Sequence, residues 1–397
     1  MRSHSRSLSQ GSRHARTGNL RARKIRAACA LGAGAVLCAV LAGCAVVTNT
    51  AAGAPSSSGP QTPVAPKYAT VTNFGASITC GYYATPQGAS GNIYSTLGYA
   101  GVFDSSLSGT TAQNLCRAGD MAADTARAWV MPNAVPALGR RQLYTLMVGT
   151  NDLLQCGGQT GCLPNFINAM TAMLSWLALP ANDKVLGSSL NVSSAWTPDL
   201  NIGVATNTAG ASLSFPVQQT VDGRTLYIAY RVFDAGKVNG GTATVQVDGK
   251  TVATLSTIAN AGRFISTPNG TSDTIWAVGI PLGAVGAHTV TITNGSSGGF
   301  FSFQWAGVSS GQYASTTGAP RVMVALLPQS TAPYFNTVEV THNNALNQLA
   351  TALAADGMWV TVVHCDSVLN ITTDLVDTVH PNTAGHAKLA AAFEGVL

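Results

Sequence analysis

Two patterns of hydrophobic and polar positions follow one another along the chain after residue 67. Short apolar runs alternate with longer amphipathic stretches up to about residue 184, and again from about residue 311. Short apolar runs predict strands, and apolar residues three and four apart predict helices. The expected strands are Val71–Phe74, Thr111–Cys116, Leu143–Val148, Arg321–Leu327 and Trp359–Val363; the expected helices are Ala122–Val130, Asn165–Leu179, Val338–Ala355 and Ala384–Phe393. This alternation predicts an α/β domain with a doubly wound parallel sheet, made of residues 68–184 and 311–397.

Residues 185–310 have a different pattern. Short β-prone runs are separated there by turn residues such as Asp248-Gly249 and Asn294-Gly295. The expected strands are Leu226–Val232, Ala243–Val247, Thr251–Ser256, Thr274–Val278, His288–Thr293 and Phe301–Trp305. We expect an inserted all-β sandwich. Because side chains alternate along a strand, Phe301, Phe303 and Trp305 are expected on one face. One of the two faces is expected to pack in the core, and the other to stack on sugar rings or to border the active site.

The first 43 residues are typical of an export signal. A basic stretch ends at Arg26, and an uncharged run of 16 residues, 27–42, follows, which is shorter than the roughly 20 residues of a membrane-spanning helix. It leads into Leu41-Ala42-Gly43-Cys44, which resembles a bacterial lipobox, in which Cys44 carries the lipid anchor. A plain secretory signal is the alternative. Residues 44–67 are rich in Pro, Ser and Gly, as in a flexible linker. We expect export from a bacterial cell, with membrane contact only through the lipid.

Charge and cysteine content agree with an exported protein. The formal charge of +5 comes from the signal, because the chain from Cys44 onward has 13 basic and 16 acidic residues. A nucleic-acid partner is therefore not expected. The short loop between Cys156 and Cys162 favours a disulfide. Cys80, after the turn that follows the first strand, and Cys116, at the end of the neighbouring strand, are also expected to pair. A metal site is not expected, since no histidine lies at ligand spacing from a cysteine.

Candidate catalytic residues follow the first strand and precede the last helix. Ser77 comes after Gly75 at the end of the first strand, where open α/β sheets bind their ligands. A nucleophilic serine needs an imidazole base and a carboxylate that orients it, and Asp377 and His380 are three residues apart. A helix-capping serine and a surface histidine are the alternatives. Of the other histidines, His386 is expected to be solvated. His288, His342 and His364 are expected to be structural, without such a carboxylate partner.

Acyl transfer also needs hydrogen-bond donors for the oxyanion. Gly119 follows the second strand, where a glycine lets the main chain approach a substrate, and Asn151 follows the third strand with a side-chain amide. Each of them alone is also explained as an ordinary turn residue.

The four blocks together resemble the SGNH (GDSL) hydrolase family, over about 205 residues and in the same order. The resemblance implies a flavodoxin-like sheet, Ser77 as nucleophile, His380 as base and Asp377 as its orienting carboxylate. It also implies an oxyanion hole made of the Ser77 and Gly119 amides and the Asn151 side chain, without a cofactor. The chain departs from the family at Ala76, where aspartate is usual, and at Cys116 and Ala118, where glycine and serine are frequent.

Together with the export signal, the resemblance implies an exported serine esterase that forms an acyl-enzyme. Its ester substrate would be borne by a carbohydrate, a lipid or a small molecule. Two alternatives stay open. An acyltransferase would use the same residues, and a surface glycan-binding lipoprotein would have lost activity, as Ala76 and the large insert suggest. Because Ser77, Asn151 and His380 all lie outside residues 185–310, we expect the chemistry to survive removal of the insert.

Overall fold

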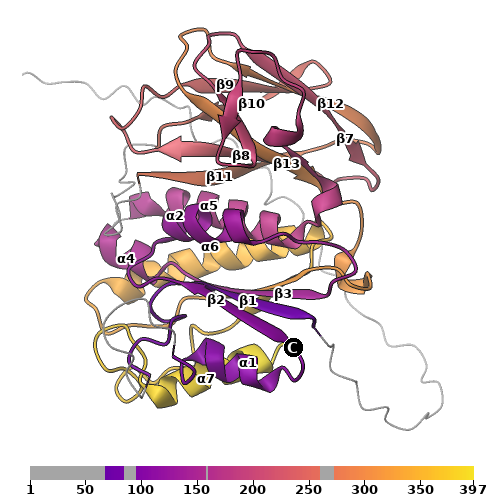
Figure 1. Ribbon diagram of the computed structural model, residues 1–397. Helices are drawn as coiled ribbons and strands as arrows, with labels where there is room; N and C mark the ends of the chain where they lie inside the picture. The colour runs from indigo at the N-terminus through magenta and orange to yellow at the C-terminus, as the bar shows by residue number, and fades with distance from the viewer. Residues whose placement is uncertain (1–67, 85–94, 158–159, 260–271) are drawn as a thin grey trace, which may run out of the picture. The chain divides into compact units, whose positions relative to one another are not determined.

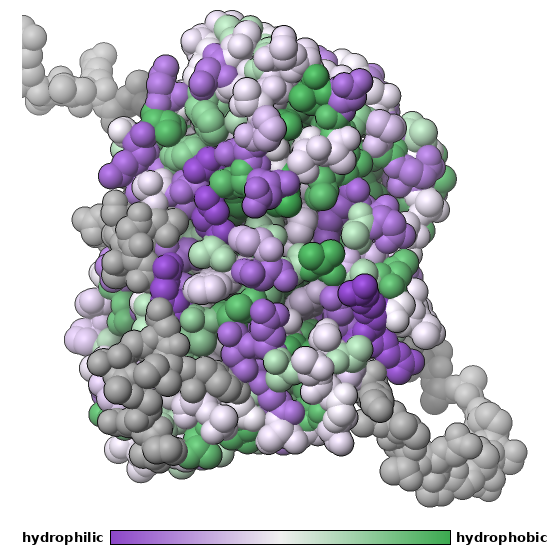
Figure 2. All heavy atoms as spheres, viewed as in Figure 1, coloured by the Kyte–Doolittle hydropathy of each residue, from purple (hydrophilic) through white to green (hydrophobic). Residues whose placement is uncertain are grey.

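The computed structural model describes residues 68–84, 95–157, 160–259 and 272–397. The expected signal, the lipid-anchor cysteine and the linker fall within residues 1–67 and so lie outside the described residues. Within the described ranges, no helix combines the length and apolar character needed to cross a membrane. On the face in Figure 2, hydrophilic and hydrophobic residues are mixed.

A five-stranded parallel sheet forms the centre of the α/β domain. Its strand order is β15-β14-β3-β1-β2, which in chain order is the 2-1-3-4-5 arrangement of flavodoxin-like sheets. The strands are β1 (Thr70–Gly75), β2 (Thr111–Cys116), β3 (Gln142–Met147), β14 (Arg321–Ala325) and β15 (Val360–Val363). Nearly every residue of β1, β3 and β14 is buried, as expected for strands covered on both faces. The predicted combination of an α/β domain with an all-β region is confirmed.

Helices cover both faces of this sheet (Figure 1). On one face lie α1 (Tyr99–Ser106) and α7 (Thr383–Glu394). The other face carries α5 (Leu163–Ala178) and α6 (Phe335–Ala355), and α4 (Thr150–Cys156) follows β3. The predicted helix over 122–130 is instead divided into α2 (Ala122–Asp124), a π-helix (Thr125–Val130) and α3 (Met131–Asn133). Single 3-10 turns occupy Thr160–Cys162, Ala181–Asp183, Gly187–Ser189 and Tyr313–Ser315.

The inserted region forms two antiparallel sheets. One has the order β10-β9-β12-β7, and the other has the order β11-β8-β13-β6-β5, with β4 paired to β13. The bounds are β4 (Lys184–Leu186), β5 (Thr197–Asp199), β6 (Gly203–Thr206), β7 (Ser212–Gln219), β8 (Thr225–Phe233), β9 (Thr242–Val247), β10 (Lys250–Ser256), β11 (Asp273–Pro281), β12 (Gly286–Asn294) and β13 (Phe301–Val308). The strands β4 to β7 were absent from the expected set.

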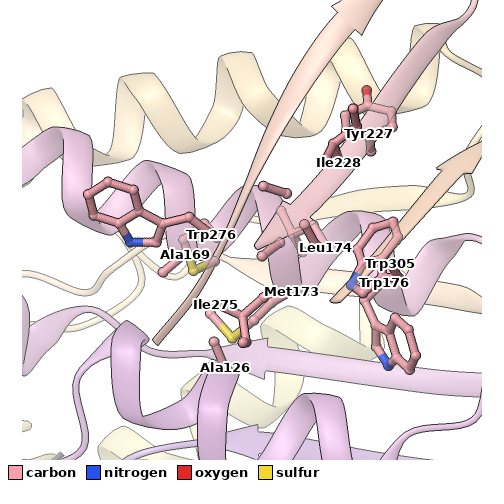
Figure 3. Packing of buried hydrophobic residues seen from close by; sticks show 14 of the residues in the cluster. Ala126, Ala169, Met173, Leu174, Trp176, Tyr227, Ile228, Ile275, Trp276 and Trp305 are labelled. Atoms are coloured by element: carbon pink, nitrogen blue, oxygen red, sulfur yellow. The ribbon is translucent and has the colours of Figure 1, made fainter. Parts of the chain in front are cut away.

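Helix α5 joins the insert to the α/β domain. Its residues from Ala169 to Ala178 are all buried, so this part of the helix has no solvent-facing side. One side of the helix faces the parallel sheet, and strand β11 of the insert packs against the helix (Figure 1). Figure 3 shows Ile275 of β11 beside the helix and Trp176 beside Trp305. The insert and the α/β domain therefore share one hydrophobic core.

The expectation that Phe301, Phe303 and Trp305 share one face is wrong. The Phe303 ring stacks on Phe215 of β7 in the facing sheet, with centroids 5.1 Å apart, whereas the Trp305 ring lies 5.5 Å from Trp176 of α5. The pairing of β13 with β8 shifts register between Phe303 and Trp305. Such a bulge adds a residue and reverses the side-chain alternation. Every residue of β13 is buried, so this strand leaves no free aromatic face for a sugar.

Candidate active site

Ser77 lies in a tight series of turns directly after β1. The Cys80 amide donates to the Ala76 carbonyl, and the Tyr82 amide donates to the Ser77 carbonyl, both at 3.0 Å. A Cβ on Gly75 would meet the Met147 carbonyl at 2.3 Å, so the strand can leave the sheet here only with glycine. These turns are irregular, and the first helix of the described residues, α1, begins only at Tyr99. Ser77 therefore does not cap a helix.

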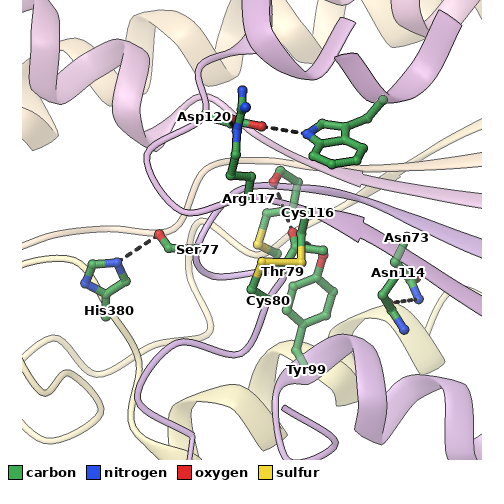
Figure 4. Close-up of a disulfide and its surroundings, with 12 residues drawn as sticks. Asn73, Ser77, Thr79, Cys80, Tyr99, Asn114, Cys116, Arg117, Asp120 and His380 are labelled. Atoms are coloured by element: carbon green, nitrogen blue, oxygen red, sulfur yellow. Dashed lines mark hydrogen bonds and ion pairs between the residues drawn. A yellow bond between two sulfur atoms is a disulfide. The ribbon is translucent and has the colours of Figure 1, made fainter. Parts of the chain in front are cut away.

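Ser77, His380 and Asp377 form a continuous chain of hydrogen bonds. The Ser77 Oγ lies 2.8 Å from the His380 Nε2 (Figure 4). On the other side of the ring, the His380 Nδ1 lies 2.7 Å from the Asp377 Oδ2. With Nδ1 protonated toward the carboxylate, Nε2 is free to accept the Ser77 proton. Ser77 is 7% exposed, and the His380 side chain is 17% exposed. Residues 303 positions apart in the sequence thus meet at one partly open site.

The Asp377 carboxylate is held as an anion by its own loop. Its Oδ1 accepts the main-chain amides of Val379 and His380, each at 2.8 Å, in an Asx turn. Burial alone would raise the pKa of Asp377. Those two amides and the His380 imidazole outweigh burial and lower the pKa below its ordinary value. Asp377 can therefore both shape the loop and stabilise an imidazolium.

The loops that carry Gly119 and Asn151 follow the two strands on either side of β1. Gly75 pairs with Cys116 of β2 and with Met147 of β3, so both loops leave the sheet beside the Ser77 turn. Gly119 has φ +83°, a left-handed conformation that favours glycine. The Asn151 side-chain amide donates to the Asp120 carbonyl at 2.9 Å. This bond uses one N–H of Asn151 and fixes the direction of the other.

Two disulfides lie close to these loops. Cys80 is joined to Cys116, with Cα atoms 5.5 Å apart, which ties the Ser77 turn to the end of β2 (Figure 4). Cys156 is joined to Cys162 at the end of α4. Cys365 is a buried free thiol. Disulfides of this kind persist in oxidising compartments.

A buried carboxylate cluster supports the loop after β2. The Asp120 carboxylate accepts hydrogen bonds from Arg117 and from the Trp129 indole, each at 2.7 Å. Burial raises the pKa of Asp120, and these two donors work against it. Asp152 caps α2 by accepting the Ala122 amide at 2.9 Å. Desolvation raises the pKa of Asp152 to about 7.

The expectation that His386 is solvated is wrong. The side chain is fully buried, its Nδ1 accepts the Tyr99 amide at 3.2 Å, and its Nε2 donates to the Tyr82 carbonyl at 3.1 Å. Desolvation lowers the pKa of His386 to about 4, which keeps the imidazole neutral and able to make both bonds. The histidine contacts segments almost 300 residues away, which its local sequence does not reveal.

Two other histidines also differ from expectation, because each has a carboxylate partner. His288 lies 2.8 Å from Asp248 on the insert, and His364 lies 3.4 Å from Asp366. Neither is part of the chain that includes Ser77. In the part of the molecule that is described, no group of three or more His, Cys, Asp or Glu residues is arranged to hold a metal ion.

Tyr82 and Tyr83 are the site residues that the sequence analysis missed. Their ring centroids lie 4.9 and 5.5 Å from that of His380. The signal was present in the sequence as two adjacent aromatic residues after Gly81, within six positions of Ser77.

Comparison with known proteins gives distant structural matches. No family model matches the chain. No curated protein matches it either. Among solved structures, a member of the lipolytic G-D-S-L family from Veillonella parvula is 13% identical, covering 83% of this chain and 97% of that chain, with a TM-score of 0.37. The M. smegmatis aryl esterase is 12% identical, covering 82% and 97%, with a TM-score of 0.34. A carbohydrate-binding module of a laminarinase from Zobellia galactanivorans is 20% identical, covering 31% and 94%, with a TM-score of 0.23.

Proposed function

We propose that the protein is an exported serine esterase. The observation that carries the proposal is the unbroken chain from the Ser77 Oγ through the His380 imidazole to the Asp377 carboxylate. A serine, an imidazole and a carboxylate in this order are the elements that nucleophilic acyl transfer requires. No bound metal or cofactor enters this mechanism.

In the first half of the proposed reaction, the Ser77 Oγ attacks the ester carbonyl while the His380 Nε2 takes the serine proton. Asp377 stabilises the imidazolium that forms. The Ser77 amide, the Gly119 amide and the free N–H of Asn151 donate to the oxyanion. When the tetrahedral intermediate collapses, His380 gives its proton to the departing alcohol, and the acyl group stays on Ser77.

In the second half, His380 takes a proton from a water molecule, and the resulting hydroxide attacks the acyl-enzyme. The acid leaves as the proton returns to Ser77. An alcohol in place of water would give an acyltransferase with the same residues. The ester is proposed to be borne by a carbohydrate or a lipid, in keeping with an envelope location.

A fluorophosphonate probe tests the assignment. We expect it to label the purified protein at Ser77, and Ser77→Ala to abolish both labelling and the hydrolysis of short acyl esters. Asp377→Asn keeps an oxygen for the two loop amides and should lower the rate less. Labelling elsewhere, or full activity of Ser77→Ala, would refute the triad. A folded protein without labelling or hydrolysis would favour the glycan-binding alternative.

We also propose that Cys44 is lipidated and anchors the domain to the cell envelope through residues 45–67. The lipobox-like sequence supports this proposal, as do the two disulfides of the described domain, which fit an oxidising compartment. Mass spectrometry of the mature N-terminus should find a lipid-modified Cys44. Cys44→Ala should release the protein from the membrane fraction, and an unmodified N-terminus downstream of Cys44 would contradict the anchor.

A further inference from the structure

Two tyrosine rings lie against the imidazole of His380. Tyr82 is tilted toward it with centroids 4.9 Å apart, Tyr83 meets it edge-on at 5.5 Å, and the two tyrosine rings lie 4.6 Å from each other. Both tyrosines are only half-buried, whereas Tyr99, Tyr144 and the other core tyrosines are buried. Tyr82 and Tyr83 thus form an aromatic wall that remains accessible beside the base.

The backbone of this wall is held in an unfavourable conformation. Tyr83 has φ +63°, a left-handed conformation that is uncommon for a bulky aromatic residue. The turn is fixed on both sides of Tyr82, because its amide donates to the Ser77 carbonyl and its carbonyl accepts from the buried His386. The fold therefore holds Tyr83 in an unfavourable backbone conformation, and the two rings lie next to His380 and not in the core.

The position of the wall assigns it to one part of the substrate. In the proposed mechanism, His380 protonates the departing alcohol, so the alcohol portion of the ester must lie next to His380. Aromatic rings offer a flat apolar face, which stacks on another flat face. Desolvation and the neighbouring Tyr82 raise the pKa of the Tyr83 phenol, and the negative charge of Asp377 adds to the rise. An anionic alcohol placed against Tyr83 would be repelled by the same carboxylate.

We propose that Tyr82 and Tyr83 bind the alcohol portion of the ester, and that this portion is a neutral ring, either a sugar or an aromatic alcohol. The inference rests on the proposed esterase function, since it uses the direction of proton transfer by His380. The competing interpretation is that the tyrosines only position the His380 imidazole. The two interpretations differ in whether the effect of removing a ring depends on the alcohol.

The test compares acetate esters that differ only in the alcohol: benzyl acetate, a monoacetylated methyl xyloside and butyl acetate. Tyr83→Asn removes the ring and suits a left-handed backbone. We expect the kcat/KM of the ring esters, relative to butyl acetate, to fall about 3- to 10-fold. Tyr83→Phe should keep the wild-type ratio. Tyr334→Asn, at an exposed tyrosine with φ +60°, is the matched control and should leave the ratio unchanged.

An equal loss on all three esters would leave the ratio unchanged, would show that the tyrosines position His380, and would overturn the inference. Unchanged activity on all three esters would overturn it as well. The benzyl and xyloside arms tell an aromatic alcohol from a sugar. Binding is measured separately by ligand-observed NMR on Ser77→Ala with the same esters, where adding Tyr83→Asn should weaken ring-ester binding by a similar factor. If the wild-type protein hydrolyses none of the esters and this difference in binding is still found, the proposed esterase function fails and the role of the aromatic wall stands. Absence of ring-ester binding would overturn the role of the aromatic wall.

Discussion

Asn151 donates its side-chain amide to the main-chain oxygen of Asp120 at a distance of 2.9 Å. The bond connects the loop after β3 to the loop after β2, which are the two loops beside the Ser77 turn. It also explains how a flexible amide is held ready before a substrate arrives. Preorganised donors are effective because they need no reorganisation as charge develops.

Replacing Asn151 by alanine should therefore lower kcat much more than it changes KM. Loss of one oxyanion donor costs about 10²- to 10³-fold in kcat. Steady-state kinetics on a short acyl ester measure this. Asn133→Ala is the matched control, because Asn133 also donates to a main-chain oxygen, that of Trp129 at 2.9 Å, but lies exposed at the end of α3. A rise in KM alone, or an equal loss in the control, would contradict the role.

The Cys80–Cys116 disulfide should stabilise the protein more than the Cys156–Cys162 disulfide does. It spans 36 positions against 6, and cross-linking a longer loop restricts the unfolded chain more. In the chain-entropy model, the free energies of unfolding fall by about 4 and about 2 kcal/mol when the respective pairs become alanine. Urea denaturation of the two double variants measures both. An equal or larger loss from the second pair would contradict the prediction.

Some parts of this fold could be predicted from sequence because their signal is local. Strands β1, β3 and β14 are buried on both faces and therefore appear as continuous apolar runs. Strand β7 also had a readable signal, since its buried and exposed residues alternate from Ser212 to Gln219, but it was overlooked. Strand β5 has three residues, one of them Pro198, and carries almost no pattern.

Other features depend on residues that are distant in sequence. Ser77, Asp377 and His380 were chosen from their chemistry, and their hydrogen bonds depend on how β1 and the final loop meet. His386 looks like a surface residue on an alanine-rich helix, and only its contacts with Tyr82 and Tyr99 show that it is buried and neutral. The bulge in β13 lies where that strand packs between β7 of the facing sheet and α5.

The stability of the protein should depend on the ionisation of Asp152. Its pKa is raised to about 7 in the folded state, so the fold favours the protonated carboxyl. This contribution to stability is fully present below the unfolded pKa of about 4 and is lost as the pH rises through about 7. Asp152→Asn keeps an oxygen for the Ala122 amide and cannot ionise.

Compared with the wild type, Asp152→Asn should therefore gain stability between pH 5 and pH 8, by a few kcal/mol at most. Urea midpoints at each pH measure the difference. Asp222→Asn is the matched control, since Asp222 also accepts a main-chain amide, that of Val285, but is exposed to solvent. A difference that does not change with pH, or that is as large in Asp222→Asn, would show that Asp152 is not the titrating group.

The shared core changes what we expect from deleting the insert. The sequence placed the candidate catalytic residues outside 185–310, which predicts that a chain joined from 184 to 311 keeps its chemistry. The structure shows that α5 is buried on all sides from Ala169 to Ala178, and that β11 packs against it. Removing the insert would expose Trp176 and its apolar neighbours, and each large side chain contributes about 1.5–3 kcal/mol by burial.

We therefore expect the deleted chain to be insoluble or to bind a hydrophobic dye without cooperative unfolding, and the full chain to unfold in a single calorimetric transition.

A point substitution tests the same idea without a deletion. Ile275→Asp places a charge on β11 within the shared core and should lower the stability of both parts together, by several kcal/mol. Val252→Asp, on β10 and 39% exposed, is the matched control and should change it by less than about 1 kcal/mol. The insert would be shown to be an independent module by separate unfolding transitions for the two parts, or by a deleted chain that is soluble and active. An α/β domain that can expose α5 to water does not depend on β11 for its fold.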